Sequence, residues 1–196
     1  MRKLNLVLAA IIGFFDGIFF LFILRTTEVK IPYSWTLPIA LALLCSVGMQ
    51  VASWIGEKLA ILLQAAKFFL VGTLNTFIDL GVLNIFILIS GIATGLFYSA
   101  FKSFSFLIAT INSYFWNKYW TFEKREKPTS REFFKFLIIT FIGFLINVGV
   151  ASFVVNGVGP KFGITEKLWA SIGAIVAAFF AFAWNFLSSK FIVFKQ

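Results

Sequence analysis

The stretch "KFFLVGTLNTFIDLGVLNIF" (67–86) is mostly apolar over the roughly twenty residues that a helix needs to cross about 30 Å of hydrocarbon. Further runs of similar length and composition occur along the chain. The six expected membrane-spanning segments are 4–24, 35–55, 68–89, 98–117, 133–155 and 168–188. Helices are expected because each satisfies its own backbone hydrogen bonds in lipid, and the alternating pattern of a barrel is absent. The sequence therefore predicts an all-α, polytopic membrane bundle of six transmembrane helices.

The composition is that of a protein whose solvent is lipid. The 196-residue chain is 60% hydrophobic and 13% charged, with a mean hydropathy of +0.95, whereas soluble domains carry about 25% charged residues. The net charge of +9 could indicate binding to nucleic acid. The basic residues lie at the ends of the apolar runs, however, which is typical of topology control and of contact with anionic lipid headgroups. Membrane lipids are therefore expected as partners, and nucleic acid is not.

The distribution of Lys and Arg between the loops predicts the orientation of the bundle. Twelve of them fall on one side, which is therefore expected to be cytoplasmic and to hold both termini: Arg2, Lys3, Lys58, Lys67, Lys118, Lys124, Arg125, Lys127, Arg131, Lys135, Lys190 and Lys195. The other side holds Arg25, Lys30, Lys161 and Lys167. Lys102 belongs to neither set, because it lies within the fourth expected helix. No small-x-small cleavage site follows the basic amino-terminal segment, so the first run is expected to be a retained helix.

The opening stretch recurs later in the chain. It aligns without gaps on "KFLIITFIGFLINVGVASFV" (135–154), which matches Asp79 with Asn147. Each copy leads into a second apolar run, and the two runs have similar endings: "NSYFWNKYWTF" (112–122) and "NFLSSKFIVF" (185–194). A lysine and aromatic residues follow an amide in both endings.

The repeat predicts two helix hairpins of the same orientation. An additional hairpin, outside the repeat, precedes them at the amino terminus. The repeated hairpins are expected at about 67–122 and 135–194. Residues 57–67 are expected to form an amphipathic lead-in along the membrane interface. The domain division that follows is an amino-terminal transmembrane hairpin at 1–56 and a four-helix core at 57–196.

Together, the two copies and the two endings resemble the GtrA-like family of small bacterial membrane proteins. The resemblance covers about residues 67–196. It implies a place in the bacterial cytoplasmic membrane and a role in cell-surface polysaccharide synthesis. Members are thought to flip polyprenyl-phosphate-linked sugars or to assist the glycosyltransferase that makes them. The partners implied are thus a polyprenyl-phosphate-linked sugar lipid and a membrane glycosyltransferase.

Polar groups inside the apolar runs are the first candidates for function, because a charge at mid-membrane costs about 3 kcal/mol on insertion scales. Asn75 and Asp79 share one face of the third expected helix. Lys102 and Asn112 lie on a polar stripe of the fourth, which ends at Asn117. Asp79 and Lys102 have comparable depth at 1.5 Å per residue, so we expect them to approach each other. Either the stripe is a path for an anionic phosphate headgroup, or the ion pair fixes the register of the two helices.

Three further sets of residues within the apolar runs are candidates for packing or for function. Asn147 and Asn185 in the second half are expected either to form interhelical hydrogen bonds or to contact the headgroup. Gly13 and Gly17 form a GxxxG motif that predicts close helix packing. Asp16, between them, has no evident role in the sequence. Its partner is expected in another helix or subunit.

Lys118 and Lys190 fall where a helix is expected to meet the cytoplasmic interface. In one interpretation each lysine extends along its helix into the interface, and Trp120 and Phe122 belong to an aromatic belt. In the other, each lysine and its neighbouring amide bind the phosphate of a lipid carrier in the inner leaflet.

Catalytic signals are weak. The chain has no histidine and one cysteine, and all its glutamates lie in loops or at helix ends. No Gly-rich phosphate loop, serine–base arrangement or metal-ligand spacing occurs in the sequence. We therefore expect a protein that is not an enzyme, without a metal or a cofactor.

Three functions remain open at this point. The first is translocation of a polyprenyl-phosphate-linked sugar, for which the substrate-binding candidates are Asn75, Asp79, Lys102, Asn112, Asn117, Lys118, Asn147, Asn185 and Lys190. The second is a membrane anchor that recruits a glycosyltransferase, with the loop at 118–135 as its docking surface. The third is a small ion or solute transporter that uses Asp16 and Asp79. Six thin helices enclose little space, which favours a homodimer.

Overall fold

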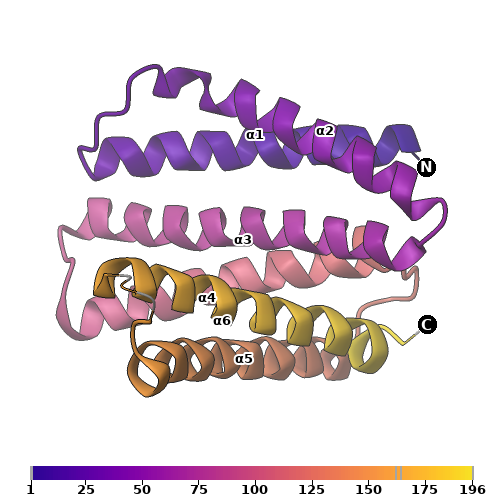
Figure 1. Ribbon diagram of the computed structural model, residues 1–196. Coiled ribbons are helices and arrows are strands. Elements are labelled where there is room, and N and C mark those ends of the chain that lie inside the picture. The colour runs from indigo at the N-terminus through magenta and orange to yellow at the C-terminus, as the bar shows by residue number, and fades with distance from the viewer. Residues whose placement is uncertain (1, 162, 164, 196) are drawn as a thin grey trace. The chain divides into compact units, whose positions relative to one another are not determined.

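The computed structural model describes residues 2–161, 163 and 165–195, and over these residues it is helical without strands (Figure 1). Six α-helices occur in this part of the chain, which confirms the predicted fold class. Their bounds are α1 Arg2–Thr26, α2 Leu37–Gly56, α3 Ala60–Ser90, α4 Gly95–Trp116, α5 Ser130–Ser152 and α6 Glu166–Ser188. Short helical segments of other pitch adjoin them: η1 Ser34–Thr36, η2 Asn117–Thr121, η3 Phe153–Val158 and η4 Ser189–Val193.

Five segments of the described chain are long and apolar enough to cross a membrane. They are Arg2–Thr26, Ser34–Gly56, Ala60–Ser90, Ser130–Val158 and Leu168–Val193. The sixth expected span, α4, is long enough, but it is not among them, because Lys102 and several serines lower its hydropathy. A multi-pass membrane protein follows from the five spans, and the membrane crossing of α4 stays a prediction.

The outer surface agrees with a lipid environment. Large apolar side chains are exposed along every helix, as Ile39, Leu43 and Val47 are on α2. Soluble proteins rarely expose contiguous apolar patches of this kind, because water penalises them. The lipid-facing side chains thus follow directly from the apolar runs in the sequence.

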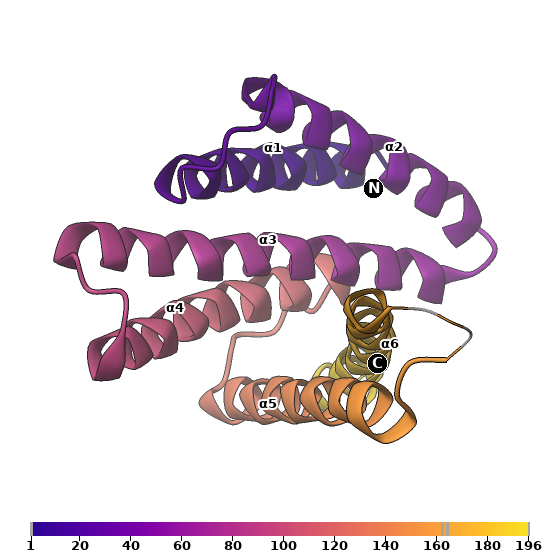
Figure 2. The ribbon, with the colours of Figure 1, turned by 60° about the vertical axis from the view of Figure 1, so that its left-hand side comes forward.

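The fold divides into two compact units, Met1–Lys124 and Arg125–Gln196. In the first unit, α3 lies between the α1–α2 hairpin and α4 (Figures 1 and 2). In the second, α5 and α6 pack against each other. The expected domain division, between residues 56 and 57, differs from this division into compact units and stays a prediction. The core of the first unit draws on α1, α2, α3 and η2: Ala9, Ile12, Met49, Val71, Leu74 and Trp120.

The GxxxG motif of α1 brings α1 and α2 into backbone contact, as predicted. A Cβ atom built on Gly13 would overlap the main-chain carbonyl of Leu41, and one built on Gly17 would overlap Pro38. Glycine is therefore required at both positions for this close approach, which gains van der Waals contact between the two helices.

The amphipathic lead-in expected at 57–67 is not a separate element. Helix α3 begins at Ala60 and continues without a break to Ser90, so most of the lead-in forms its first turns. At 1.5 Å per residue the 31 residues of α3 extend about 46 Å, well beyond the hydrocarbon thickness. The turn after α3 contains Gly91 and Gly95, both at positive φ (70° and 72°), which glycine adopts without strain.

Candidate functional site

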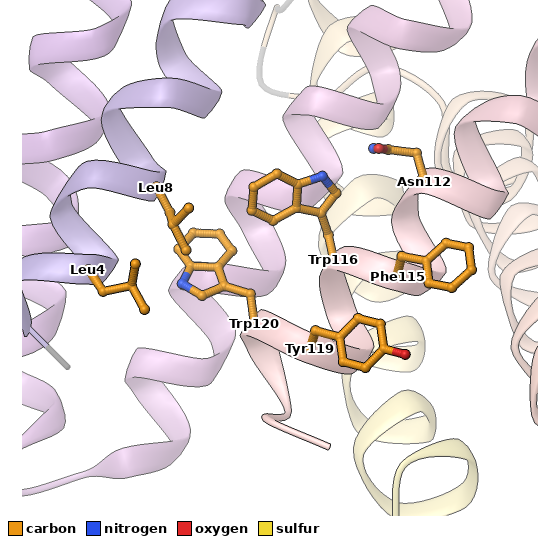
Figure 3. A pocket seen from close by; sticks show the side chains of 7 residues that line it. All are labelled: Leu4, Leu8, Asn112, Phe115, Trp116, Tyr119 and Trp120. Carbon is orange, nitrogen blue, oxygen red and sulfur yellow. The ribbon is translucent and has the colours of Figure 1, made fainter. Parts of the chain in front are cut away.

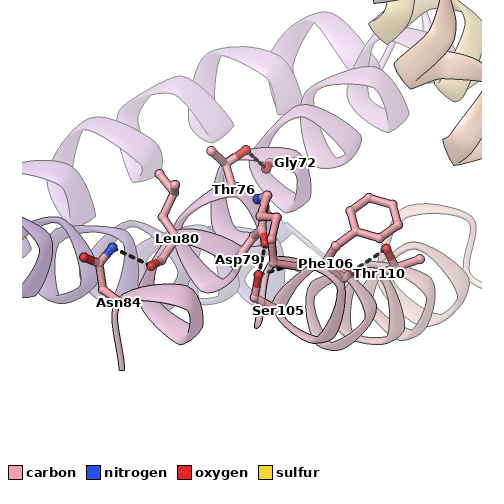
Figure 4. A network of polar contacts seen from close by, with 9 residues as sticks. Gly72, Thr76, Asp79, Leu80, Asn84, Ser105, Phe106 and Thr110 are labelled. Atoms are coloured by element: carbon pink, nitrogen blue, oxygen red, sulfur yellow. Dashed lines mark hydrogen bonds and ion pairs between the residues drawn. The ribbon is translucent and has the colours of Figure 1, made fainter. Parts of the chain in front are cut away.

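Asp79 of α3 and Lys102 of α4 form an ion pair, as predicted from their comparable depth along the two helices. The Lys102 ammonium donates to Oδ2 of Asp79. Figure 4 shows Ser105 beside Asp79, where its hydroxyl donates to the other carboxylate oxygen, Oδ1, at 2.5 Å. The carboxylate is mostly buried, whereas 42% of the Lys102 side chain is exposed. The pairing offsets the cost of holding two charges in an apolar bundle. It also leaves a cationic group on the surface of the helix pair.

An amide pair continues the polar contacts one turn along α3. The side-chain nitrogen of Asn112 donates to the side-chain oxygen of Asn75 at 2.9 Å. Asn75 in turn donates to the carbonyl oxygen of Val71, four residues earlier. Two consecutive turns of α3 thus present hydrogen-bonding groups to α4. We call the five residues Asn75, Asp79, Lys102, Ser105 and Asn112 the α3–α4 polar track.

We call the endings "NSYFWNKYWTF" (112–122) and "NFLSSKFIVF" (185–194) the first and the second closing motif. The first covers the end of α4 and the π-helical segment η2 that follows it. The side chain of Asn117 is buried and donates to the hydroxyl of Ser113 at 3.2 Å. The side-chain oxygen of Asn117, like the hydroxyl of Thr121, is buried without a hydrogen-bond partner in the described structure. Such groups are uncommon in folded proteins, because each loses its bonds to water.

Lys118 does not extend to a membrane interface. Its side chain is 0% exposed, and its ammonium lies 6.0 Å from the centre of the Tyr114 ring. Trp120 and Phe122 are also buried. The expected snorkelling lysine and aromatic belt are therefore wrong for the first motif, because η2 turns these side chains into the protein.

The two closing motifs share one local structure, as the repeat predicts. Both are π-helical, and in each a main-chain hydrogen bond spans five residues: from Phe122 to Asn117 at 2.9 Å, and from Phe194 to Ser189 at 2.8 Å. The ring of Phe122 lies 6.1 Å from that of Phe68.

The repeat-equivalent rings of Phe194 and Phe136 are 6.0 Å apart. Single turns of π-helix inside α-helices are rare and often mark functional positions.

The second unit has a different polar arrangement. The amide of Asn185 on α6 lies directly against Gly143 of α5, where a Cβ atom would overlap it. Its side-chain oxygen and the hydroxyl of Ser189 are buried without a partner in the described structure. Asn147 is half-buried one turn beyond Gly143. Lys190 is half-buried, and its ammonium lies 5.7 Å from the ring of Phe191.

The sequence did not indicate the role of Lys67. Counted above as a cytoplasmic loop residue, it lies inside α3 and is 2% exposed. Its ammonium donates to Glu123 at 2.8 Å and to the carbonyl oxygen of Trp120 at 3.2 Å. The indole nitrogen of Trp120 donates to Asn5 of α1 at 3.0 Å. A lysine begins both repeats, Lys67 in the first and Lys135 in the second, and this was the one available signal of a structural role.

A pocket of about 390 Å³ opens beside the first closing motif. Figure 3 shows Leu4 and Leu8 of α1 facing the indoles of Trp116 and Trp120 across it. Asn112, one of the two amides of the polar track, lines the same pocket. The remaining lining residues are aromatic: Phe115 and Tyr119. Aromatic faces beside an amide suit the apolar and polar parts of an amphiphilic ligand.

Comparison with known proteins identifies one family. The model described as "GtrA/DPMS, transmembrane domain" matches residues 67–194, from within α3 to one residue past η4. The match confirms the resemblance expected from the repeated stretches and leaves α1 and α2 outside. No curated protein and no solved structure matches the chain.

Proposed function

Because the chain belongs to the GtrA/DPMS transmembrane-domain family, we propose that it translocates a polyprenyl-phosphate-linked sugar across the bacterial cytoplasmic membrane. The observation that supports this proposal best is the α3–α4 polar track. Its ion pair and amide pair lie on helices whose other faces are apolar. Polar groups at this depth are costly, and they are typical of substrate pathways in membrane proteins.

In this proposal the headgroup moves along the track while the isoprenoid tail stays in lipid. The phosphate replaces Asp79 as the partner of the Lys102 ammonium. Because the Lys102 side chain is partly exposed, a second anion can reach it. The sugar hydroxyls exchange hydrogen bonds with Asn75 and Asn112. The pocket beside Asn112 holds the first isoprene units. Consumption of the lipid-linked sugar on the far side drives net flow.

In the same proposal each closing motif forms the inner-leaflet end of the polar face of its own unit. Each motif holds buried polar atoms without hydrogen-bond partners in the described structure: those of Asn117 and Thr121 in the first unit, and those of Asn185 and Ser189 in the second. The hydroxyls of an entering headgroup would satisfy them. Lys118 supplies positive charge in the first unit and Lys190 in the second, where Asn147 extends the polar face of α5. In this proposal both chain termini lie in the cytoplasm, and the protein acts as a homodimer.

The test is translocation of a fluorescent polyprenyl-phosphate sugar by the purified protein in vesicles. The double variant Asp79→Asn/Lys102→Met removes both charges, so neither charge is left unpaired. It is expected to fold and to lose translocation. Ser99→Ala, on the exposed side of α4, is the matched control and should translocate normally. No translocation by the unmodified protein, or full activity of the double variant, would overturn the proposal.

A second function is supported by the loop between η2 and α5. Residues 125–130 are exposed and include Arg125 and Lys127, which suits docking of a cytoplasmic glycosyltransferase. In that case the protein is an accessory subunit. Co-purification of a glycosyltransferase that is lost on replacing both basic residues by Ser, together with no translocation by the protein alone, would favour this function over the first.

A further inference from the structure

A second polar site lies in the first unit, apart from the polar track and on helices that the family match leaves largely outside. Asp16 of α1 is 3% exposed. Its Oδ2 atom accepts a hydrogen bond from Thr73 of α3 at 2.8 Å. Its Oδ1 atom is buried and has no hydrogen-bond partner in the described structure.

The position of Asp16 makes this lone oxygen costly. It lies 14 residues after Arg2, about 21 Å along a helix that is long enough to span the membrane. Among the described residues, no Lys or Arg lies within ion-pair distance of Asp16. A carboxylate at this depth with a single hydroxyl partner is under-compensated, because burial removes the water that would solvate it.

Asp16 and Thr73 line a cavity of about 520 Å³ between α1, α2 and α3. The other lining residues are almost all apolar, including Phe20, Met49 and Phe77. A cavity of about 300–1,000 Å³ suits a small amphiphile or a single lipid chain. The site therefore combines an apolar chamber with one unsatisfied acidic group.

The cavity opens toward the lipid-facing surface. Leu44 and Phe69, which line it, are 65% and 58% exposed, and both belong to the apolar exterior of the helices. A Cβ atom on Gly48, another lining residue, would meet nothing within 4 Å. An occupant therefore enters from the bilayer and carries an apolar chain.

We propose that this cavity binds a lipid whose head carries a primary ammonium group, with the ammonium donating to Oδ1 of Asp16 and the chain lying against the apolar residues. The positive charge complements Asp16, and the N–H donors satisfy the oxygen that the protein leaves without a partner. Thr73 holds the carboxylate in place through Oδ2. A neutral or anionic head of the same size would leave the charge uncompensated.

The only cysteine of the chain, Cys45, lines the same cavity and reports on its occupancy. The experiment measures the rate of N-ethylmaleimide labelling of the full-length protein in detergent, with added dodecylamine, dodecanol or dodecyltrimethylammonium. Dodecylamine is expected to slow labelling about tenfold more than dodecanol does, because it adds a charge-assisted hydrogen bond. It should also protect more than the quaternary amine, which has no N–H donor.

Asp16→Asn tests the acidic group, and Glu28→Gln, in the exposed loop after α1, is its matched control. The first should abolish the preference for dodecylamine and the second should retain it. Thermal unfolding of each variant, with and without dodecylamine, gives a second readout that does not depend on labelling. Equal protection by dodecylamine and dodecanol, equal protection by the quaternary amine, or a preference that survives Asp16→Asn would overturn the proposal.

Discussion

The ammonium of Lys67 lies 2.8 Å from a carboxylate oxygen of Glu123, 56 residues further along the chain. The contact connects the residues just after η2 to the first turns of α3. The main-chain carbonyl of Trp120 accepts a second hydrogen bond from the same ammonium. Since Lys67 is buried and Glu123 is exposed, the two partners are not equivalent. Removing the carboxylate leaves a buried cation with fewer partners.

We predict that Glu123→Gln lowers the free energy of unfolding by about 1–2 kcal/mol, since solvent screening on the Glu123 side reduces the value of the pair. Thermal unfolding in detergent measures the change. Glu126→Gln, which removes a carboxylate from the same exposed loop, should have almost no effect. Equal stability of the two variants would contradict a stabilising role for the contact between Lys67 and Glu123.

We predict that Gly13→Ala destabilises the α1–α2 hairpin by about 1–3 kcal/mol, because the added methyl group would overlap the backbone of α2. Gly48→Ala on α2 is the matched control. Its Cβ meets nothing within 4 Å, so it should be neutral or slightly stabilising through helix propensity. Unfolding temperatures of the purified variants check both expectations. A loss at both positions would point to a general intolerance of substitution in this hairpin.

For the ion pair of the polar track, we predict strong coupling between Asp79 and Lys102. Asp79→Asn or Lys102→Met alone leaves one charge without its partner in an apolar bundle and should cost about 3 kcal/mol or more. The double variant should recover much of this loss. A double-mutant cycle on unfolding free energies gives the coupling. Additive losses would mean that the two groups are solvated independently.

The ring pair of the second unit gives a prediction about the repeat. Phe136 and Phe194 are both buried, so Phe194→Ala should cost about 3–5 kcal/mol. Because the rings touch, its combination with Phe136→Ala should cost less than the sum. Phe191→Ala, in the same η4 segment but exposed, is expected to cost under about 0.5 kcal/mol.

If the repeat is structural, Phe122→Ala and Phe68→Ala should reproduce this pattern in the first unit, where the rings have the equivalent separation. The same unfolding measurement applies. A large loss in one unit and none in the other would show that the two closing motifs are alike in backbone only.

The sequence by itself determined the helices, because runs of about twenty apolar residues leave few alternatives in lipid. It also determined the approach of Asp79 to Lys102, because helical rise converts residue number into depth. The packing of Gly13 and Gly17 followed from their spacing. These features depend on one helix, or on two consecutive helices joined by a short turn.

Only the tertiary structure decided the contacts between elements distant in sequence. Lys67 with Glu123, Trp120 with Asn5 and Asp16 with Thr73 join groups 56 to 115 residues apart, and no periodicity in the sequence specifies them. The burial of Lys118 was likewise not predictable, because it follows from the π-helical turn of η2. The wider hydrogen-bonded turn redirects the side chain from the interface into the protein, and the apolar pattern of the sequence does not indicate where such a turn occurs.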